Sequence, residues 1–417
     1  MERVDVIIIG AGPSGACAGA LLARAGKRVL CIEKQHFPRF SIGESLLPHC
    51  MEFLASAGLL DAVEAGALEH GFQFKDGAAF LKQGQHTEFD FTKKSSPGPG
   101  TTYQVKRAAF DQLLADAASK QGMEIRYGEA VESLEYQKSY QESVALSIRK
   151  EGGENYRVQA GFVLDASGFG RVLPRLLDLE EPSNFPVRQA NFCHIKDQIS
   201  DPAFDRNKIL ITVHPTQQDV WFWLIPFSDG TASLGVVGCP ERFNEEQTSE
   251  QKLWEKVHDE PDLSALLSNA TMISEARDLT GYSANVRSLY GKRYALLGNA
   301  GEFLDPVFSS GVTIALRSSE KAVPLVLREL DGENVDWEVE YSVPLRKGIN
   351  TFRCFVEAWY DGRFQNIIFN PDRQPEISAM ISSILAGYAW DQNNPYVAET
   401  SRRIQVLSDL CSDSLAS

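Results

Sequence analysis

Features that would place this 417-residue chain among membrane, secreted or nucleic-acid-binding proteins are missing from its sequence. No apolar run approaches the ~18 residues that cross a bilayer, so we expect no transmembrane segment. The run Val6-Ile7-Ile8-Ile9 is too short for a signal peptide, and we therefore predict a cytoplasmic location. Basic residues number 41 and acidic residues 56, which gives a formal net charge of −15. Nucleic acid is not an expected partner, because its phosphates need a basic face.

Cysteine is sparse and unpatterned, with seven residues and no pair at CxxC spacing. A zinc ribbon and a thioredoxin-type motif are therefore excluded, and no metal site is predicted. The odd number and the wide spacing predict reduced thiols. A second G-x-G-x-x-G is also absent, so the sequence contains no recognisable separate lobe for NAD(P)H.

The sequence begins with the pattern of a strand–helix–strand unit. Residues 4–9 are a short β-branched run followed by glycine, residues 13–25 are rich in small residues and leucine, and residues 27–33 form a second strand pattern. Closely spaced apolar runs within residues 185–280, without helices between them, predict an antiparallel sheet. From residue 336 onward the pattern is helical, with a break at Asn370-Pro371-Asp372. Further helices are predicted at residues 46–66, 107–121 and 311–330.

A glycine-rich sequence, Gly10-Ala11-Gly12-Pro13-Ser14-Gly15, lies between the first strand and the first helix. In that context the first glycine allows a tight turn, and the second lets the backbone approach a pyrophosphate at the helix N-terminus. Glu33 ends the second strand, where a carboxylate accepts hydrogen bonds from a ribose hydroxyl. A plain glycine turn beside a surface glutamate is a weak alternative here. The predicted dinucleotide contacts are Gly10, Gly12, Pro13, Ser14, Gly15, Glu33 and Lys34.

Two later loops indicate which dinucleotide is bound. Asp165-Ala166-Ser167-Gly168 follows a strand in mid-chain, and Gly298-Asn299-Ala300, with Asp305 beyond it, follows the last strand. With the glycine turn, these loops resemble the FAD-binding fold of the aromatic hydroxylase group of flavoproteins. The resemblance implies that Arg107 and the loops at Asp165, Gly298 and Asp305 contact FAD. That group usually has Asp where this chain has Asn299, and because an amide both donates and accepts, we expect altered affinity rather than loss.

The implied fold class is α/β, a Rossmann-like FAD-binding fold of the aromatic-hydroxylase type with an antiparallel-sheet substrate domain and a C-terminal helical region. The expected FAD-binding domain is discontinuous and comprises residues 1–75, 101–180 and 281–330. Residues 76–100 and 181–280 are assigned to the substrate-domain sheet, and residues 331–417 to the helical region.

The most informative segment is Trp221-Phe222-Trp223-Leu224-Ile225-Pro226. On a strand, Trp221, Trp223 and Ile225 share one face and make a rigid apolar wall. An aromatic ladder in the core explains the pattern alone equally well. However, W-x-W-x-I-P resembles the signature of flavin-dependent halogenases at every fixed position. In that family the tryptophans lie beside the flavin and are thought to discourage ordinary hydroxylation.

Two further loops resemble halogenase segments. Residues 38–45 (PRFSIGES) resemble the strap over the flavin, and residues 305–312 (DPVFSSGV) resemble the loop that places backbone N–H groups near flavin and halide. A helix N-terminus suits an anion, because its N–H groups lack partners and its dipole end is positive. That Ser310 simply caps a helix beginning at Gly311 is an alternative, and both can be true. The implied flavin contacts are Gly43, Glu44, Ser45, Gly311 and Val312, and the implied halide contacts are Ser310 and Gly311.

Lys75 is the candidate catalytic residue, together with Trp221 and Trp223. It lies in Gly71-Phe72-Gln73-Phe74-Lys75-Asp76-Gly77-Ala78, which is similar to the lysine segment of the halogenases. In that family, reduced FAD, O2 and halide yield hypohalous acid, which the lysine holds by a hydrogen bond or carries as a haloamine. Burial can make a lysine deprotonate near neutral pH, whereas arginine stays charged. A solvated surface lysine is the alternative.

The resemblance also bears on substrate and partners. It is closer to the phenol- and pyrrole-type halogenases than to the tryptophan type, which carries Glu where this chain has Phe308. The short C-terminal part predicts an open site that suits a large or carrier-tethered aromatic. The implied cofactors are FAD, reduced by a separate flavin reductase, and chloride or bromide.

Other classes of function stay open at this point. A geranylgeranyl-reductase-type alkene reductase shares Trp223 and Pro226 of the strand motif, an aromatic hydroxylase would need no halide, and a non-catalytic FAD-binding protein would retain the fold alone. No motif identifies a base for the ring proton. The possible groups are Glu44, His49, His194 and His214, although a histidine outside a motif is more often structural.

Overall fold

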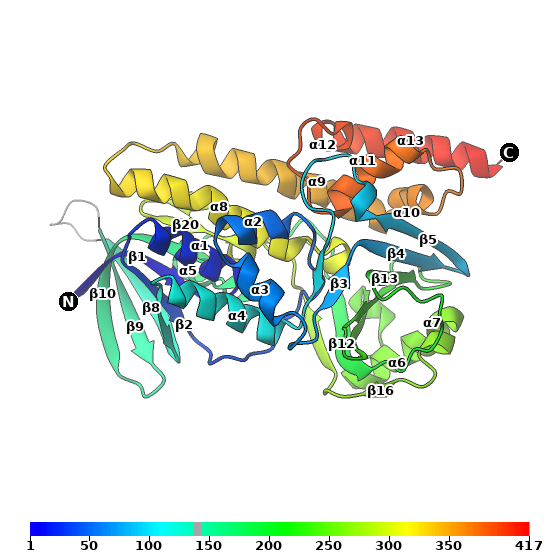
Figure 1. Cartoon of the computed structure of the whole chain (residues 1–417), viewed down its shortest axis with the longest axis horizontal. Helices are drawn as coiled ribbons and strands as arrows, with labels where there is room; N and C mark the ends of the chain where they lie inside the picture. Colours follow the sequence, from blue (N-terminus) through cyan, green and yellow to red (C-terminus); the bar gives the residue numbers. More distant parts are fainter. Residues whose placement is uncertain (137–142, 417) are drawn as a thin grey trace.

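The computed structural model describes residues 1–136 and 143–416. One large sheet lies toward the N-terminal end of the molecule, and another lies beneath the C-terminal helices (Figure 1). Two long helices, α8 (Ser310–Leu330) and α9 (Val343–Tyr360), run along the upper side of the view (Figure 1). The chain is therefore a mixed α/β protein, as the sequence predicts.

The first sheet has the strand order β19-β20-β10-β1-β2-β7, with β9 added to β10 and β8 added to β9. Its centre is parallel, from β20 through β10, β1 and β2 to β7. Because parallel strands are covered on both faces, the apolar run of β1 is buried from Val6 to Ile9. The bounds are β1 Glu2–Ile9, β2 Val29–Glu33, β7 Glu124–Tyr127, β8 Glu129–Tyr136, β9 Val144–Lys150, β10 Asn155–Asp165, β19 Tyr290–Gly291 and β20 Tyr294–Leu296.

The predicted strand–helix–strand unit is confirmed. Helix α1 (Pro13–Arg24) connects β1 to β2 and packs against α8 and against α4 (Arg107–Lys120). A buried contact joins α1 to α8, because the Ser319 hydroxyl donates to the Ser14 carbonyl oxygen at 2.8 Å. The beginning of α1 thus lies close to an element almost 300 residues later in the sequence.

The second sheet has the order β16-β12-β15-β14-β13-β4-β5, with β17 also paired to β12. Its pairs are antiparallel, as predicted, except that β13 pairs with β4 in parallel. The exception arises because β4 and β5 come from an early part of the chain and join the edge of a sheet built much later. The bounds are β4 Gly77–Lys82, β5 Gln85–Asp90, β12 Gln189–Lys196, β13 Lys208–Val213, β14 Trp221–Pro226, β15 Thr231–Gly238, β16 Thr271–Met272 and β17 Arg277–Thr280.

Short elements connect the large sheets. β3 (Gln73–Lys75) pairs with β6 (Thr102–Gln104), and β11 (Glu180–Glu181) pairs with β18 (Asn285–Val286). The prediction of one helix at residues 46–66 is wrong, because the structure has two helices there. Gly58, with a φ of +66°, ends the first of them. The helices here are α2 Cys50–Ser56, α3 Leu60–Gly66, α5 Val172–Leu176, α6 Ser249–Asp259 and α7 Pro261–Leu266.

The region after residue 336 is helical, and the predicted break at Asn370-Pro371-Asp372 lies between two helices. These helices cover β4 and β5 at the C-terminal end of the molecule (Figure 1). Their bounds are α10 Arg363–Ile368, α11 Pro375–Leu385, α12 Pro395–Ala398 and α13 Thr400–Ala416. The domain boundaries drawn from the sequence stay a prediction.

Candidate functional site

The glycine turn between β1 and α1 admits no larger side chain at its first and last positions. Gly10 has a φ of +97°, and a Cβ added there would lie 2.7 Å from the Ala166 carbonyl oxygen. A Cβ on Gly15 would lie 1.9 Å from the Gly10 carbonyl oxygen. No side chain caps α1, which begins at Pro13. The turn therefore presents backbone N–H groups at a helix N-terminus, as a pyrophosphate site requires.

Glu33 ends β2 beside this turn and is buried. Its Oε2 accepts from the Ala11 N–H at 2.9 Å, and its Oε1 accepts from the Gln35 N–H at 2.9 Å. The carboxylate thus lies next to the glycine turn, where a nucleotide ribose would come. Lys34 follows it and is exposed.

Arg107 lies beneath the predicted strap and is engaged with protein groups. Its Nε and Nη2 donate to the buried Asp111 carboxylate at 2.7 and 3.0 Å, and its Nη1 donates to the Ile42 carbonyl oxygen at 2.5 Å. Arg39 donates from Nη1 to the same carboxylate at 3.1 Å. Arg107 therefore anchors the strap near Gly43. Sequence reasoning missed this role, because it did not single out Asp111 or Arg39 as partners.

The loop after β10 is shaped by the Asp165 side chain. Its carboxylate accepts from the Ser167 N–H at 2.9 Å and from the Leu173 N–H at 2.6 Å, and it is fully buried. Burial raises the pKa of this carboxyl group against the opposing effect of its hydrogen bonds. Asp165 therefore holds the loop that closes over Gly10 rather than pointing outward.

Asn299 carries an unsatisfied polar atom at the candidate cofactor site. It lies in the 3-10 turn Gly298–Ala300, and its buried Oδ1 has no hydrogen-bond partner within residues 1–136 and 143–416. This oxygen is 3.8 Å from the position that a Cβ on Gly311 would take. A buried amide oxygen without a partner, beside a glycine at a helix start, fits the hydroxyl-bearing chain of a dinucleotide such as FAD.

Helix α8 begins at Ser310, one residue earlier than predicted. Ser309 precedes it with a φ of +54°, and no side chain caps the helix. The alternative that Ser310 is an N-cap is therefore wrong, because the left-handed turn at Ser309 already starts the helix at Ser310. The first N–H groups of α8, including those of Gly311 and Val312, have no intrahelical acceptor, and the helix dipole adds positive potential there.

Lys75 is fully buried at the end of β3. Its Nζ donates to the Ser45 hydroxyl at 2.7 Å and to the Leu46 carbonyl oxygen at 2.8 Å, and it lies 5.5 Å from the centre of the Phe91 ring. No carboxylate in the described part of the chain forms an ion pair with it. Burial lowers the pKa of Lys75 to about 7, so a large fraction of it is a neutral amine near pH 7.

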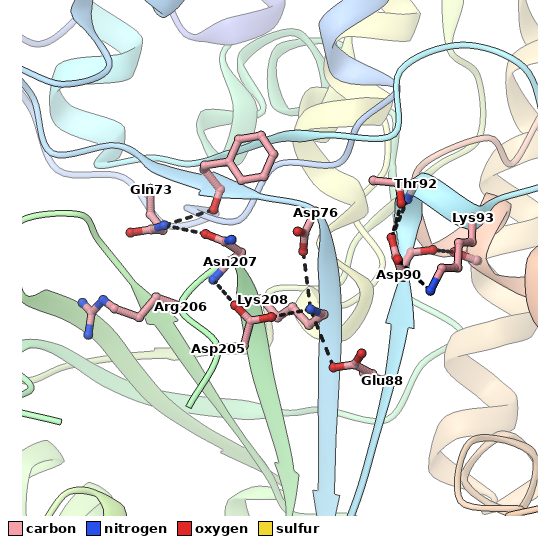
Figure 2. Close-up of polar contacts among 12 residues, drawn as sticks. Gln73, Asp76, Glu88, Asp90, Thr92, Lys93, Asp205, Arg206, Asn207 and Lys208 are labelled. Carbon is pink, nitrogen blue, oxygen red and sulfur yellow. Dashed lines mark hydrogen bonds and ion pairs between the residues drawn. The ribbon is translucent and has the colours of Figure 1, made fainter. Parts of the chain in front are cut away.

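A second buried lysine, Lys208 at the start of β13, has the opposite environment. Figure 2 shows its Nζ between the carboxylates of Asp76, Glu88 and Asp205, with the first two at 3.5 and 3.6 Å. Burial by itself lowers the pKa of Lys208, but the hydrogen bond with Asp205 and the nearby negative charges outweigh it and raise the pKa. Burial therefore lowers the pKa of Lys75 because no anionic partner offsets it, as the carboxylates do at Lys208.

The tryptophan strand is β14, and its alternation is as predicted. Trp221 and Trp223 are buried, with ring centres 6.0 Å apart, and they face the core that contains Phe308. Phe222 and Leu224 face the separate core beneath α6 and α7. The Trp223 indole N–H donates to the Ser233 hydroxyl at 3.1 Å.

Asp305 belongs to a buried polar network that sequence reasoning missed. Its Oδ2 accepts from the hydroxyls of Tyr360 at 2.9 Å and Tyr282 at 3.2 Å, and the Trp221 indole N–H donates to the Tyr360 hydroxyl at 3.0 Å. Burial raises the pKa of Asp305 to about 6. No local signal could reveal the pairing, since Trp221 and Tyr360 are 139 residues apart in the sequence.

The groups considered as a base lie in three different places. His194 Nε2 is 2.7 Å from the buried Glu44 Oε1, on the face of β12 that carries Phe192. His49 bonds the Gly387 carbonyl oxygen at 2.9 Å, and His214 Nδ1 accepts from backbone N–H groups. The contact of His49 is that of a structural residue, and His214 Nδ1 holds its own turn.

Within residues 1–136 and 143–416, no helix is both long and apolar enough to cross a membrane. All seven cysteines lie in this part of the chain, and no disulfide joins them there. They are Cys17, Cys31, Cys50, Cys193, Cys239, Cys354 and Cys411.

Known proteins are similar to this chain over most of its length. A family model described as an FAD binding domain matches residues 3–324. The chain is 30% identical to a 1H-pyrrole-2-carbonyl-[peptidyl-carrier protein] brominase of Pseudoalteromonas luteoviolacea, over 82% of this chain and 80% of the relative. It is 33% identical to a tryptophan 2-halogenase of Chondromyces crocatus, over 80% of this chain and 62% of that relative.

Solved structures are similar over nearly the whole chain. A flavoprotein/dehydrogenase of Cytophaga hutchinsonii superposes with a TM-score of 0.93 at 40% identity, covering 99% of this chain and 100% of that one. A flavin-dependent brominase superposes with a TM-score of 0.82 at 26% identity, covering 98% of this chain and 99% of that one.

Proposed function

This chain belongs to the flavin-dependent halogenase family and is an FAD-dependent oxidoreductase, and from that premise we propose that it halogenates an electron-rich aromatic ring. The proposed reaction uses reduced FAD, O2 and chloride or bromide, and passes through hypohalous acid and Lys75. The proposed substrate is phenolic or pyrrolic, free or tethered to a carrier protein. A separate flavin reductase is proposed to supply reduced FAD, and a cytoplasmic location stays a prediction.

The observation that carries the proposal is the environment of Lys75. A buried lysine without an anionic partner is costly unless it can lose its proton. Its amine is held by Ser45 and Leu46, at the end of the strap that Arg107 anchors. A neutral amine can react with hypohalous acid to give a haloamine and water, so that an N–halogen bond replaces an N–H bond. A protonated amine can only donate hydrogen bonds to the same species, and both forms are present near a pKa of about 7.

The proposed FAD contacts come from separate parts of the chain. FAD, when bound, supplies the electrons that activate O2 for oxidation of the halide. The glycine turn and Glu33 are proposed to hold the adenosine and pyrophosphate end, and the amide of Asn299 the chain of hydroxyls beyond it. The orphan Oδ1 of Asn299 supports that placement. Ser310 and Gly311, at the start of α8, are proposed to bind the halide through their N–H groups.

The names of two relatives support a pyrrolic substrate, whereas the name of the tryptophan 2-halogenase does not. Besides the pyrrole brominase, the chain is 26% identical to a 1H-pyrrole-2-carbonyl-[peptidyl-carrier protein] chlorinase of Pseudomonas fluorescens over 92% of that protein's length. Phe308 lies against Phe355, Trp359 and Phe364 in this structure. An apolar cluster there offers no charged partner to the ammonium group of free tryptophan, which favours a phenolic or pyrrolic ring.

The test requires no knowledge of the natural substrate. Purified protein is mixed with chemically reduced FAD, O2, bromide and catalase, and bromination of phloroglucinol, an electron-rich phenol, is quantified by mass spectrometry, with tryptophan in a parallel reaction. We expect bromide-dependent product with wild-type protein and none with Lys75→Ala, which still binds FAD. Lys82→Met is the matched control. It also removes a lysine amine, but that amine, on β4, donates to Gln365 and has no hydrogen bond to the strap.

Full bromination by Lys75→Ala would contradict the assignment. Rapid flavin reoxidation without halide dependence and without brominated product would favour an alkene reductase or an aromatic hydroxylase instead. Lipid alkenes would then be the next substrates to assay.

A further inference from the structure

A hydrogen-bonded chain with only one possible direction joins the tryptophan strand to the loop before α8. Trp221 Nε1 is 3.0 Å from the Tyr360 hydroxyl, which is 2.9 Å from Asp305 Oδ2. An indole nitrogen can only donate and an ionised carboxylate can only accept. The Tyr360 oxygen therefore accepts from Trp221, and its one proton is donated to Asp305.

The same carboxylate shapes the loop that leads into α8. Asp305 Oδ1 accepts from the Val307 N–H at 3.0 Å and so caps the 3-10 turn Pro306–Phe308. Ser309 follows directly, in the left-handed conformation, and Ser310 begins the helix. The position of the first N–H groups of α8 thus depends on where the Asp305 carboxylate is held.

Other contacts fix Tyr360 itself. The guanidinium of Arg188 lies 3.9 Å above the centre of the Tyr360 ring, a cation–π contact, and its Nη1 is 3.4 Å from Asp219 Oδ2. Tyr282 is a second hydroxyl donor to Asp305, at 3.2 Å. No hydrogen bond in the described part of the chain joins Tyr282 to Trp221. Tyr360 is therefore the member of the network that bridges two functional segments.

We propose that Tyr360 is a positioning residue for the halide site. It acts through Asp305, and it fixes the loop that carries Ser310 relative to the wall formed by Trp221. This inference rests on the proposed halogenase function. Without the Tyr360 hydroxyl, the Trp221 N–H is buried without an acceptor and Asp305 loses one of its donors, so the loop before α8 can adopt other positions.

The experiment measures halide binding rather than turnover. Bromide is titrated into FAD-loaded protein, and the dissociation constant is read from the change in flavin absorption. We expect Tyr360→Phe to weaken bromide binding by about tenfold, the effect of one lost hydrogen bond. FAD affinity is expected to stay unchanged. Tyr341→Phe is the control, because the Tyr341 hydroxyl is buried but donates to the Leu296 carbonyl oxygen, at 2.7 Å, away from Asp305.

Trp221→Phe removes the hydrogen bond from the Trp221 indole to the Tyr360 hydroxyl. This second variant keeps the test decisive if Tyr360→Phe loses FAD. The double variant is expected to bind bromide no more weakly than the weaker single variant, because both changes remove one link. Equal bromide affinity in wild type and Tyr360→Phe would overturn the inference, as would an equal loss in Tyr341→Phe or additive effects in the double variant. If wild type also forms no brominated phloroglucinol, the halogenase proposal itself fails and this inference fails with it.

Discussion

The burial of Lys75 makes the stability of the wild-type protein depend on pH, and comparison with Lys75→Met makes that dependence measurable. The side chain is fully buried, and its pKa falls from 10.5 to about 7. Between these values the unfolded chain holds a proton that the folded chain has released, so the stability of the wild-type protein rises with pH. One pKa unit corresponds to about 1.4 kcal/mol. Because Lys75 in the folded protein is already half deprotonated at pH 7, wild type is expected to gain about 2 kcal/mol relative to Lys75→Met from pH 7 to pH 9.

The assay is urea unfolding of both proteins at pH 6, 7, 8 and 9, followed by circular dichroism. Taking the difference between the two proteins cancels the titration of every other group. Methionine fills a similar volume but leaves Ser45 and the Leu46 carbonyl without the amine, a constant cost that shifts the difference without changing its slope. Lys208→Met is the control, and its difference from wild type should be flat over this range, because the pKa of Lys208 is raised. A flat difference for Lys75→Met would refute the reasoning, since it would mean that the folded protein keeps Lys75 charged.

Three further predictions follow from individual contacts. Asp305 has its pKa raised to about 6, so the folded protein holds the extra proton between pH 4 and pH 6; wild type should lose about 2 kcal/mol relative to Asp305→Asn over that range, measured by denaturant unfolding. Arg107→Ala leaves the buried Asp111 without its bidentate partner and should cost about 3–5 kcal/mol and weaken FAD binding, measured by thermal unfolding and flavin fluorescence; unchanged values would contradict the anchoring role. Gly15→Ala, whose Cβ would lie 1.9 Å from a carbonyl oxygen, should abolish FAD binding, whereas Gly152→Ala, with open space around it, should leave the absorption of bound flavin unchanged.

The parts of the fold that were predictable have local signals. The β1–α1–β2 unit has short apolar runs on both sides of a glycine turn, and the alternation of Trp221 and Trp223 on β14 follows from the two-residue period of a strand. Residues 76–100 were assigned to the substrate-domain sheet, but nothing in residues 77–82 specifies that β4 pairs with β13, or that the two strands are parallel. Helix 46–66 was predicted as continuous because its apolar pattern does not reveal that Gly58 takes a positive φ.

The candidate site was predictable to the extent that its residues lie in motifs. Lys75, the glycine turn and the loop at Ser310 were found in this way. What the motifs could not give is the direction of each side chain. That Asp165 contacts the cofactor stays a prediction, and its carboxylate accepts hydrogen bonds from N–H groups of its own loop. Tyr282 and Tyr360 carry no motif, and only the folded chain brings them to Asp305.

The measurement that tests the central claim most directly is bromination by Lys75→Arg. Arginine keeps a positive charge and hydrogen-bond donors near Ser45 but cannot become a neutral amine at neutral pH. If a deprotonated Lys75 carries the halogen, this variant should still bind FAD and consume O2 in the presence of reduced FAD and bromide. It should form no more brominated phloroglucinol than Lys75→Ala does. Bromination at the wild-type rate by Lys75→Arg, with FAD bound, would show that a fixed cation is sufficient and would contradict the account.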